Sequence, residues 1–364
     1  MIKNIFAFII LVHGLIHLMG FAKSFDYGHM TQLTKEIPKP LGIIWLIVAA
    51  LFVATTIMLI AKNESWPLTA LIAVVVSQVL VITTWQDAKF GTVANVIILI
   101  VAVFTLTAQH FESRFKADVK MHLEGSNTKD ADLLTAADIQ SWPLPVQRYL
   151  RYAKVVGKAK VKNVKILFDG EMRGREKDWF KFSSVQYNFF DQPTRLFFMK
   201  AQMFGITVPG YHKYQDETAT MDIRLFGLFP VVQAKGPEMN LAETVTLFND
   251  MCIMVPATLI DKRIEWEAID STSARGIFTN GAHKISAVLY FNEAGQLVNF
   301  ISDDRYDVND MKQYRFSTPM KDYKTFNDIN VPGYGEAIWH YPDGDFVYGK
   351  FLLRNLAYNI RDLD

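Results

Sequence analysis

Four apolar segments in the first 110 residues constrain the fold more than any other feature of the sequence. They cover residues 4–22, 42–61, 66–85 and 92–108, and none of them contains Asp, Glu, Lys or Arg. A helix needs about 20 apolar residues to cross the hydrocarbon core of a bilayer. Trp45, Trp66 and Trp85 lie at or near segment ends, where membrane proteins favour aromatic side chains. We therefore expect an all-α, four-helix transmembrane bundle over residues 1–110.

The first segment has Lys3 before an apolar run, as a signal peptide would. It lacks a small-x-small cleavage pattern, however, and three further spans follow it, so we expect a retained helix in a multi-pass protein. Four spans place both ends of the bundle on one side of the membrane. Lys and Arg are nearly equally frequent in the loops on the two sides, with a small excess on the side of the C-terminal region, which favours a cytoplasmic C-terminal domain.

Two histidines interrupt the apolar first segment. His13 and His17 are four residues apart, so on a helix they lie on one face, about one turn apart. Ionisable side chains are costly in lipid and normally face the bundle interior. If the helices run up and down, His17 is level with Asn95 of the fourth segment and His13 is near Gln78 of the third, with Asp87 in the turn at the same end. These five residues form one predicted polar cluster.

This cluster has two interpretations. The side chains can fix helix packing through hydrogen bonds between helices, or they can form a functional site for a metal, a quinone, a lipid head group or a proton. The spacing of His13 and His17 suits two metal ligands, but a catalytic metal site usually needs a third, and Asp87 is the one acid nearby. His110, which a bis-histidine haem would need, lies at the opposite end of the bundle. We predict no cofactor and keep a metal or haem at the two histidines as an alternative.

From Val161 onward the apolar pattern changes to period two, which is typical of strands. Turn signals at 292–295 and 342–344 predict hairpins, and residues 241–254 predict a helix. We expect residues 135–364 to form a mainly antiparallel sheet of about ten strands, curved or closed into an open barrel, with one or two packed helices. Residues 111–134 are expected to be a linker, with a frayed extension of the fourth helix over residues 109–132 as the alternative. The predicted strands are 161–168, 179–189, 195–203, 219–225, 264–269, 274–279, 284–291, 297–302 and 346–355.

Phe, Tyr, Met and Trp are abundant between Trp179 and Phe229. A curved sheet lined in this way can hold an apolar ligand, although aromatic strands also form ordinary cores. The candidate ligand-binding residues are Phe198, Met203, Tyr211, His212 and Tyr214.

No P-loop, GxSxG, HExxH or dinucleotide-binding glycine motif occurs in the sequence, so the catalytic residues, if any, are unknown. In ISDDRY we favour an ion pair of Arg305 with Asp303 or Asp304 over a pair of catalytic carboxylates. Cys252 has no adjacent basic residue that would activate its thiol. The formal net charge of +1 argues against a nucleic-acid partner.

Five motifs occur in order between residues 135 and 360: LPVQRYLRYAKVVG, NDMCIMVPATLID, IEWEAID, LYFNEAGQLVNFISDDRY and YGKFLLRNLAYN. Together they resemble a bacterial family of unknown function whose members share a β-rich C-terminal domain, sometimes behind a helical membrane region. The HGLIHLMGF stretch is similar to membrane segments of some members. The resemblance implies a bacterial origin but no activity. With the four predicted spans, we therefore expect a multi-pass protein of the bacterial inner membrane. The expected curved sheet is also similar to lipocalin-like and lipoprotein-carrier folds, which is an analogy of fold and not of function.

These observations favour a membrane-anchored protein that binds an apolar or lipid-like ligand in its curved β-domain beside the bilayer. Membrane lipids and an apolar small molecule or lipid are the expected partners. The sequence does not indicate which oligomeric state the protein has. One alternative is a membrane-embedded enzyme or redox protein that uses His13, His17 and Asp87. Another is a structural or interaction scaffold.

Overall fold

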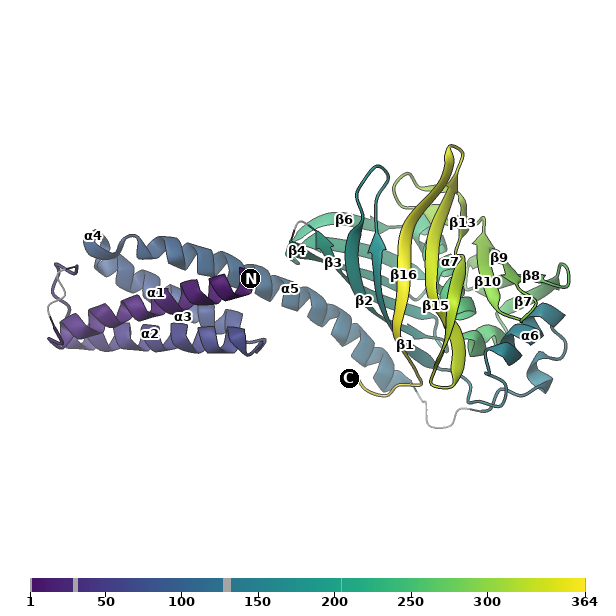
Figure 1. Ribbon diagram of the computed structural model, residues 1–364, viewed down its shortest axis with the longest axis horizontal. Coiled ribbons are helices and arrows are strands. Elements are labelled where there is room, and N and C mark those ends of the chain that lie inside the picture. The colour runs from purple at the N-terminus through teal and green to yellow at the C-terminus, as the bar shows by residue number, and fades with distance from the viewer. Residues whose placement is uncertain (1, 29–31, 127–131, 204, 364) are drawn as a thin grey trace. The chain divides into compact units, whose positions relative to one another are not determined.

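The computed structural model describes residues 2–28, 32–126, 132–203 and 205–363. The chain divides into two compact units (Figure 1). One consists of the residues up to His110 together with Phe226–Leu228, and we call it the helical unit. The other contains Phe111–Leu225 and the residues from Phe229 onward, and we call it the β-unit.

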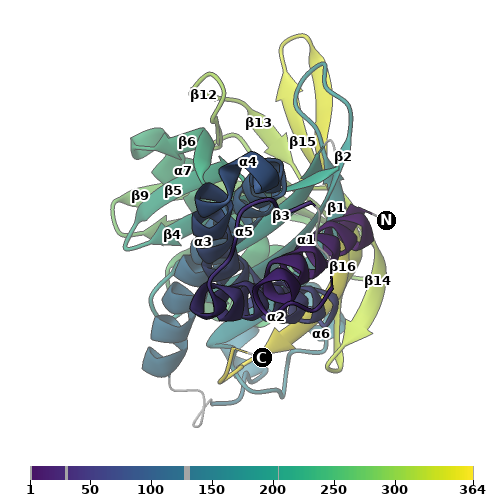
Figure 2. The ribbon, with the colours of Figure 1, turned by 90° about the vertical axis from the view of Figure 1, so that its left-hand side faces the viewer.

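Four helices that begin in the helical unit are long and apolar enough to cross a membrane (Figure 2), and the last of them continues beyond His110 into the β-unit. They are α1 (Ile2–Ser24), α2 (Lys39–Ile60), α3 (Trp66–Thr83) and α5 (Gly91–Gly125), with the short α4 (Trp85–Ala88) between the last two. Outward-facing residues such as Phe8, Ile57 and Val75 are exposed although they are apolar. The prediction of four apolar helices is confirmed.

Small residues let helices α1 and α2 approach closely. A Cβ atom added at Gly14 would lie 2.7 Å from the Cβ of Phe52, and one added at Gly20 would lie 2.2 Å from Cδ2 of Trp45. Gly at a helix contact brings the two backbones together, and this increases the van der Waals contact on which helix association in lipid depends. Phe52 and Trp45 are buried in the resulting core of the helical unit.

The β-unit is built on one antiparallel sheet of fourteen strands. Its main path runs in the order β6-β5-β4-β3-β2-β1-β16-β15-β13-β10-β9-β8-β7, and β14 pairs with β15. Because β6 and β7 end this path as edges, the curved sheet is open and not a closed barrel (Figure 1). The strands are β1 (Asn163–Met172), β2 (Phe180–Phe189), β3 (Thr194–Met203), β4 (Ile206–Gln215), β5 (Thr218–Leu225), β6 (Phe229–Lys235), β7 (Ile264–Ala268), β8 (Ser273–Asn280), β9 (His283–Phe291), β10 (Leu297–Ser302), β13 (Arg315–Ser317), β14 (Met320–Phe326), β15 (Ile329–Tyr341) and β16 (Gly344–Tyr358). The separate pair is β11 (Tyr306–Asp307) with β12 (Lys312–Gln313).

The predicted fold class is confirmed, including the hairpin turns between β9 and β10 and between β15 and β16. The predicted number of strands was too low, chiefly because β4 and β15 each contain a Pro–Gly pair that favours a turn in the sequence. In the structure these glycines allow close approach within the sheet. A Cβ added at Gly333 would lie 2.6 Å from the carbonyl oxygen of Asp322, and one added at Gly210 would lie 3.2 Å from Cγ1 of Ile223.

Helices cover both faces of the sheet. Helix α7 (Pro237–Ile253) lies within the curve of the sheet and buries Val245, Phe248 and Met251 in the main core (Figure 1). The shorter α6 (Leu144–Tyr152) contributes to this core, and two 3-10 turns occur at Ala137–Ile139 and Pro256–Ile260.

The last part of α5 covers the opposite face. Residues 111–125, which we expected to belong to a linker, are helical, and Phe111 and Phe115 pack against Tyr187, Phe198 and Tyr211. Residues 127–131 of the expected linker lie outside the described residues. The segment is helical because its apolar side chains recur every three or four residues and meet an apolar sheet face.

Candidate functional site

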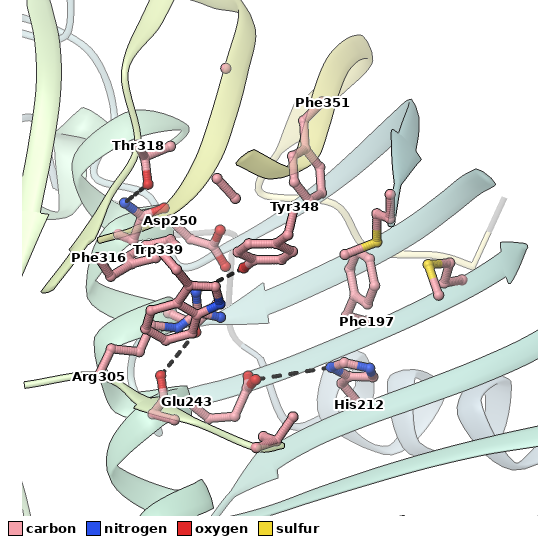
Figure 3. Close-up of a pocket in the computed structure, with 18 of the residues that line it drawn as sticks. Phe197, His212, Glu243, Asp250, Arg305, Phe316, Thr318, Trp339, Tyr348 and Phe351 are labelled. Carbon is pink, nitrogen blue, oxygen red and sulfur yellow. Dashed lines mark hydrogen bonds and ion pairs between the residues drawn. The ribbon is translucent and has the colours of Figure 1, made fainter. Parts of the chain in front are cut away.

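A cavity of about 390 Å³ lies between α7 and the concave face of the sheet (Figure 3). Small-molecule sites in proteins commonly occupy about 300–1,000 Å³. Most of the lining is apolar, and methionine is unusually frequent in it. The lining methionines are Met172, Met199, Met221, Met239, Met254 and Met320, and the aromatic residues include Phe168, Phe180, Phe197, Phe316, Trp339, Tyr348 and Phe351.

The alternation of β3 explains which side chains reach this cavity. Arg195, Phe197 and Met199 point to the α7 side and line it, whereas Leu196 and Phe198 point to the face covered by α5. Methionine has three rotatable bonds and a polarizable sulfur, so a methionine-rich wall adapts to ligands of different shape. The cavity is therefore suited to apolar ligands that differ in shape.

One wall of the cavity holds a buried ion network centred on Arg195. Its Nη1 lies 3.1 Å from Oε2 of Glu243, and its Nε lies 2.8 Å from Oδ2 of Asp250. Both carboxylates belong to α7, seven residues apart, so they lie on one side of that helix. Burial alone would lower the pKa of Arg195, but Asp250 and Glu243 outweigh it and raise the pKa above its ordinary value. Arg195 is therefore charged.

Two amides on β2 complete the network. Nε2 of Gln186 donates to Oδ2 of Asp250 at 2.6 Å, and Nδ2 of Asn188 donates to the same oxygen at 3.0 Å. Nη2 of Arg195 donates to Oε1 of Gln186 at 3.2 Å. Buried charges need this kind of compensation from hydrogen bonds. The network fixes α7 against β2 and β3.

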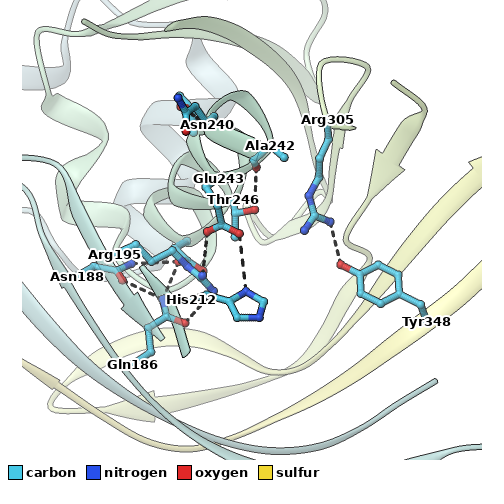
Figure 4. A network of polar contacts seen from close by, with 12 residues as sticks. Gln186, Asn188, Arg195, His212, Asn240, Ala242, Glu243, Thr246, Arg305 and Tyr348 are labelled. Carbon is cyan, nitrogen blue, oxygen red and sulfur yellow. Dashed lines mark hydrogen bonds and ion pairs between the residues drawn. The ribbon is translucent and has the colours of Figure 1, made fainter. Parts of the chain in front are cut away.

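His212 lies beside the network on β4. Its Nδ1 is 4.0 Å from Oε1 of Glu243, so His212 and Arg195 approach different oxygens of the same carboxylate (Figure 4). Burial lowers the pKa of His212 to about 4; Glu243 raises it in part, while the charges of Arg195 and Arg305 lower it further. His212 is therefore neutral at pH 7.

Arg305 lies on another part of the wall, in the connection between β10 and β11. Its Nη1 donates to the hydroxyl of Tyr348 at 2.8 Å (Figure 4). Its guanidinium carbon lies 4.1 Å from the ring centroid of Phe316 and 5.0 Å from that of Trp339. The ion pair that the sequence analysis favoured, with Asp303 or Asp304, does not form: Asp303 pairs with Arg315, and Asp304 accepts hydrogen bonds from Ser286.

The five candidate ligand-binding residues lie in different places. His212 lines the cavity. Met203 and Tyr214 pack with the core on the same side of the sheet without lining the cavity, and Tyr214 donates to or accepts from Thr244 on α7 at 2.8 Å. Phe198 and Tyr211 lie on the opposite face against α5, where the Tyr211 hydroxyl donates to Asp118 at 2.7 Å.

Arg195, Glu243 and Arg305 were not among the predicted site residues. A signal for Arg195 was present, since it is a charged residue at the start of the apolar run RLFFM. A charge in a strand that is buried on both faces requires a partner. The spacing of Glu243 and Asp250 along the predicted helix supplied two such partners on one helix face. Nothing in the local sequence indicated that Arg305 would enter a cavity.

The helical unit holds a second polar cluster. Nε2 of His13 lies 2.9 Å from Oδ1 of Asn95, and Nδ2 of Asn95 donates to Oε1 of Gln78 at 3.0 Å. Nε2 of His17 lies 2.8 Å from the hydroxyl of Ser77, which donates to Oδ1 of Asn95 at 3.0 Å. The structure thus brings together His13, His17, Gln78 and Asn95, with Ser77 at the centre. His13 rather than His17 meets Asn95, so the predicted level of the two histidines relative to Asn95 was wrong by about one helical turn.

Asp87 lies apart from these contacts. Its carboxylate accepts hydrogen bonds from the backbone N–H groups of Thr34 and Lys35, at 2.7 and 3.2 Å, and from the Thr34 hydroxyl. It therefore ties the loop before α2 to the turn after α3. Among the residues described here, no group of three or more His, Cys, Asp or Glu is placed to hold a metal ion.

The model of a family of unknown function, DUF6544, matches residues 132–351, which is more than half of the chain. The chain belongs to this family. The match covers all residues that line the cavity except Leu353, and it confirms the resemblance found in the sequence. No curated protein matches the chain.

Several solved structures are distantly similar to this DUF6544 chain. One is a LolA superfamily protein from Nitrosomonas europaea, with 10% sequence identity and a TM-score of 0.35 over 60% of this chain and 94% of the other. Another is a DUF1329 family protein from Desulfovibrio piger, also at 10% identity and a TM-score of 0.35, over 60% of this chain and 95% of the other.

Proposed function

We propose that this DUF6544 protein binds an apolar or lipid-like ligand in the cavity of its β-unit. The observation that carries this proposal is the methionine- and aromatic-rich lining of a cavity of about 390 Å³. Apolar burial contributes about 25 cal/mol per Å² of surface removed from water. A ligand with an extended apolar portion would gain most from this wall.

The proposal is tested by measuring the binding of a neutral apolar probe. Full-length protein in amphipol would be dialysed to equilibrium with radiolabelled dodecanol, with protein-free amphipol as the baseline. We expect saturable binding of one dodecanol per chain. Binding no greater than that of amphipol alone would overturn the proposal.

A pair of variants locates the binding. Met199→Trp places a larger side chain at the cavity wall and should reduce dodecanol binding, because the added ring occupies ligand volume. Ile269→Trp makes the same addition at an exposed position outside the lining and should leave binding unchanged. Equal dodecanol binding by the two variants would show that dodecanol does not bind in this cavity.

The membrane anchor is part of the same proposal. Four helices that are long and apolar enough to span a bilayer support it, and the small excess of Lys and Arg supports a cytoplasmic β-unit. An alkaline carbonate wash of bacterial membranes should leave the protein in the pellet. A fluorescent protein fused to the C-terminus should fluoresce, because it would lie in the cytoplasm. Release by carbonate would contradict anchoring, and a dark fusion with normal expression would contradict the orientation.

A further inference from the structure

Arg305 is a cation in the cavity wall that lacks an acidic partner. No carboxylate among the described residues forms an ion pair with it, and its Nε is buried without a hydrogen-bond acceptor. The nearby acids are engaged elsewhere. Asp304 accepts from Ser286, and Asp307 accepts from the hydroxyl of Tyr341 at 2.6 Å. A buried donor without an acceptor is destabilising, so an acceptor at this position would satisfy the site better.

The rings around Arg305 hold the guanidinium in place. Phe316, Trp339 and Tyr348 come from three different strands, and their centroids lie 4.1, 5.0 and 6.0 Å from the guanidinium carbon. Stacking of this kind restricts the guanidinium plane. The Tyr348 hydroxyl uses one donor on Nη1. An arginine has five N–H donors in a rigid fork, so donors remain for a planar or tetrahedral anion.

The other charges of the cavity do not offer a comparable site. The charge of Arg195 is matched by Glu243 and Asp250, and His212 is neutral at pH 7. Arg175 forms an ion pair with Asp343. Arg173 also forms no ion pair within the described part of the chain, but its Nε donates to the backbone oxygen of Val347 at 2.9 Å. Among the described cations of the cavity, Arg305 alone combines the lack of a carboxylate partner with a buried Nε that has no acceptor.

We propose that the ligand is an anionic amphiphile, with a carboxylate or phosphate head group on Arg305 and an apolar chain along the methionine-lined wall. This inference rests on the proposed function, because the apolar chain would occupy the same cavity. It adds a head-group charge and a residue that recognises it. Figure 3 shows Arg305 with Phe316, Trp339 and Tyr348 at one part of the lining and Phe197 and Phe351 at another.

The test compares three probes with the same C12 chain: dodecanoate, dodecyl phosphate and dodecanol. They are dialysed against full-length wild-type protein, Arg305→Met and Arg275→Met, all in amphipol. Met keeps much of the length of Arg but removes its charge and donors. Arg275 is the matched control because it is exposed, pairs with Glu267 and lies outside the cavity lining.

We expect the wild-type protein to bind at least one of the two anions about tenfold more tightly than dodecanol, in line with the strength of charge-assisted hydrogen bonds. Arg305→Met should abolish this preference while dodecanol binding remains, and Arg275→Met should retain it. Comparison of the two anions shows whether the head group is a carboxylate or a phosphate.

The outcomes separate the two proposals. If dodecanol does not bind the wild-type protein above the amphipol baseline, the proposed function fails. If dodecanol binds but neither anion binds more tightly, or if Arg305→Met keeps the anion preference, the inference about Arg305 fails and the apolar cavity stands. Retained dodecanol binding shows that Arg305→Met is folded. If Arg305→Met loses all binding, Arg305→Lys is measured in its place. A restored preference for the anions supports the head-group role of Arg305. Restored dodecanol binding without a preference for the anions overturns that role.

Discussion

Nε of Arg195 on β3 lies 2.8 Å from Oδ2 of Asp250 on α7, and both side chains are buried. This pair joins the curved sheet to α7. Removing one member of a buried ion pair leaves the other charge without compensation, which costs about 3–5 kcal/mol.

Arg195→Met should therefore destabilise the β-unit by about 3–5 kcal/mol, since Glu243 and Asp250 would lose their shared cation. Guanidinium-induced unfolding of the full-length protein, followed by tryptophan fluorescence, measures this. Arg275→Met breaks an exposed pair with Glu267 and should cost at most about 1 kcal/mol. Similar losses in the two variants would show that the network does not stabilise the fold.

Acidification should destabilise the β-unit through His212. Because the folded pKa is about 4 and the unfolded value is about 6.5, the unfolded chain binds more protons between these values. Stability from the neutral imidazole is complete above about pH 6.5 and is lost as pH falls toward 4, by up to about 3 kcal/mol. His212→Gln should reduce the difference in unfolding free energy between pH 7.5 and 4.5. An unchanged difference would contradict a neutral, buried imidazole.

Phe197 and Phe198 are adjacent on β3 but face opposite sides of the sheet. Phe197→Ala should weaken dodecanol binding about tenfold, because a buried Phe contributes about 1.5–3 kcal/mol of contact. Phe198→Ala should leave dodecanol affinity unchanged, although the sequence analysis predicted that Phe198 binds the ligand. Equilibrium dialysis measures both. A larger loss in Phe198→Ala would move the ligand to the other face.

Phe115 should hold the end of α5 on the sheet. Its ring packs 5.3 Å from that of Phe198 and 5.5 Å from that of Tyr211. Phe115→Ala should cost about 3–5 kcal/mol and increase amide hydrogen exchange in residues 111–125. Lys120→Ala, at an exposed position of the same helix, is the control and should leave that exchange unchanged. Protection retained in Phe115→Ala would show that other contacts hold the helix.

Asn95 should stabilise the helical unit, because it links His13, Ser77 and Gln78. Hydrogen bonds between helices in lipid contribute about 0.6 kcal/mol each on average. Asn95→Leu should therefore lower stability by about 1–2 kcal/mol, measured as a lower melting temperature in detergent. Val96→Ala on the exposed face should change it little. An equal effect of the two would argue against a packing role for the cluster.

Much of the fold could be predicted because it depends on local patterns. Hydropathy predicts the four apolar helices, and the alternation of apolar and polar residues with a period of two predicts most strands. The strands β4 and β15 were missed because their Pro–Gly pairs have the local character of turns, and only close approach within the sheet shows why glycine is present there. Residues 111–125 were predicted to be a linker or a frayed helix end, because their apolar side chains gain from a stable helix only when a sheet face covers them.

The sequence by itself determined that this chain has an apolar helical part and a mainly antiparallel β part, because hydropathy and side-chain periodicity are local properties. Only the tertiary structure decided which sheet face encloses the cavity and which charges meet there. Arg195 finds its partners 48 and 55 residues later in the chain, whereas Arg305, next to two acidic residues, forms no ion pair with either of them. Sequence adjacency does not fix side-chain direction, so pairing across the core had to come from the packed fold.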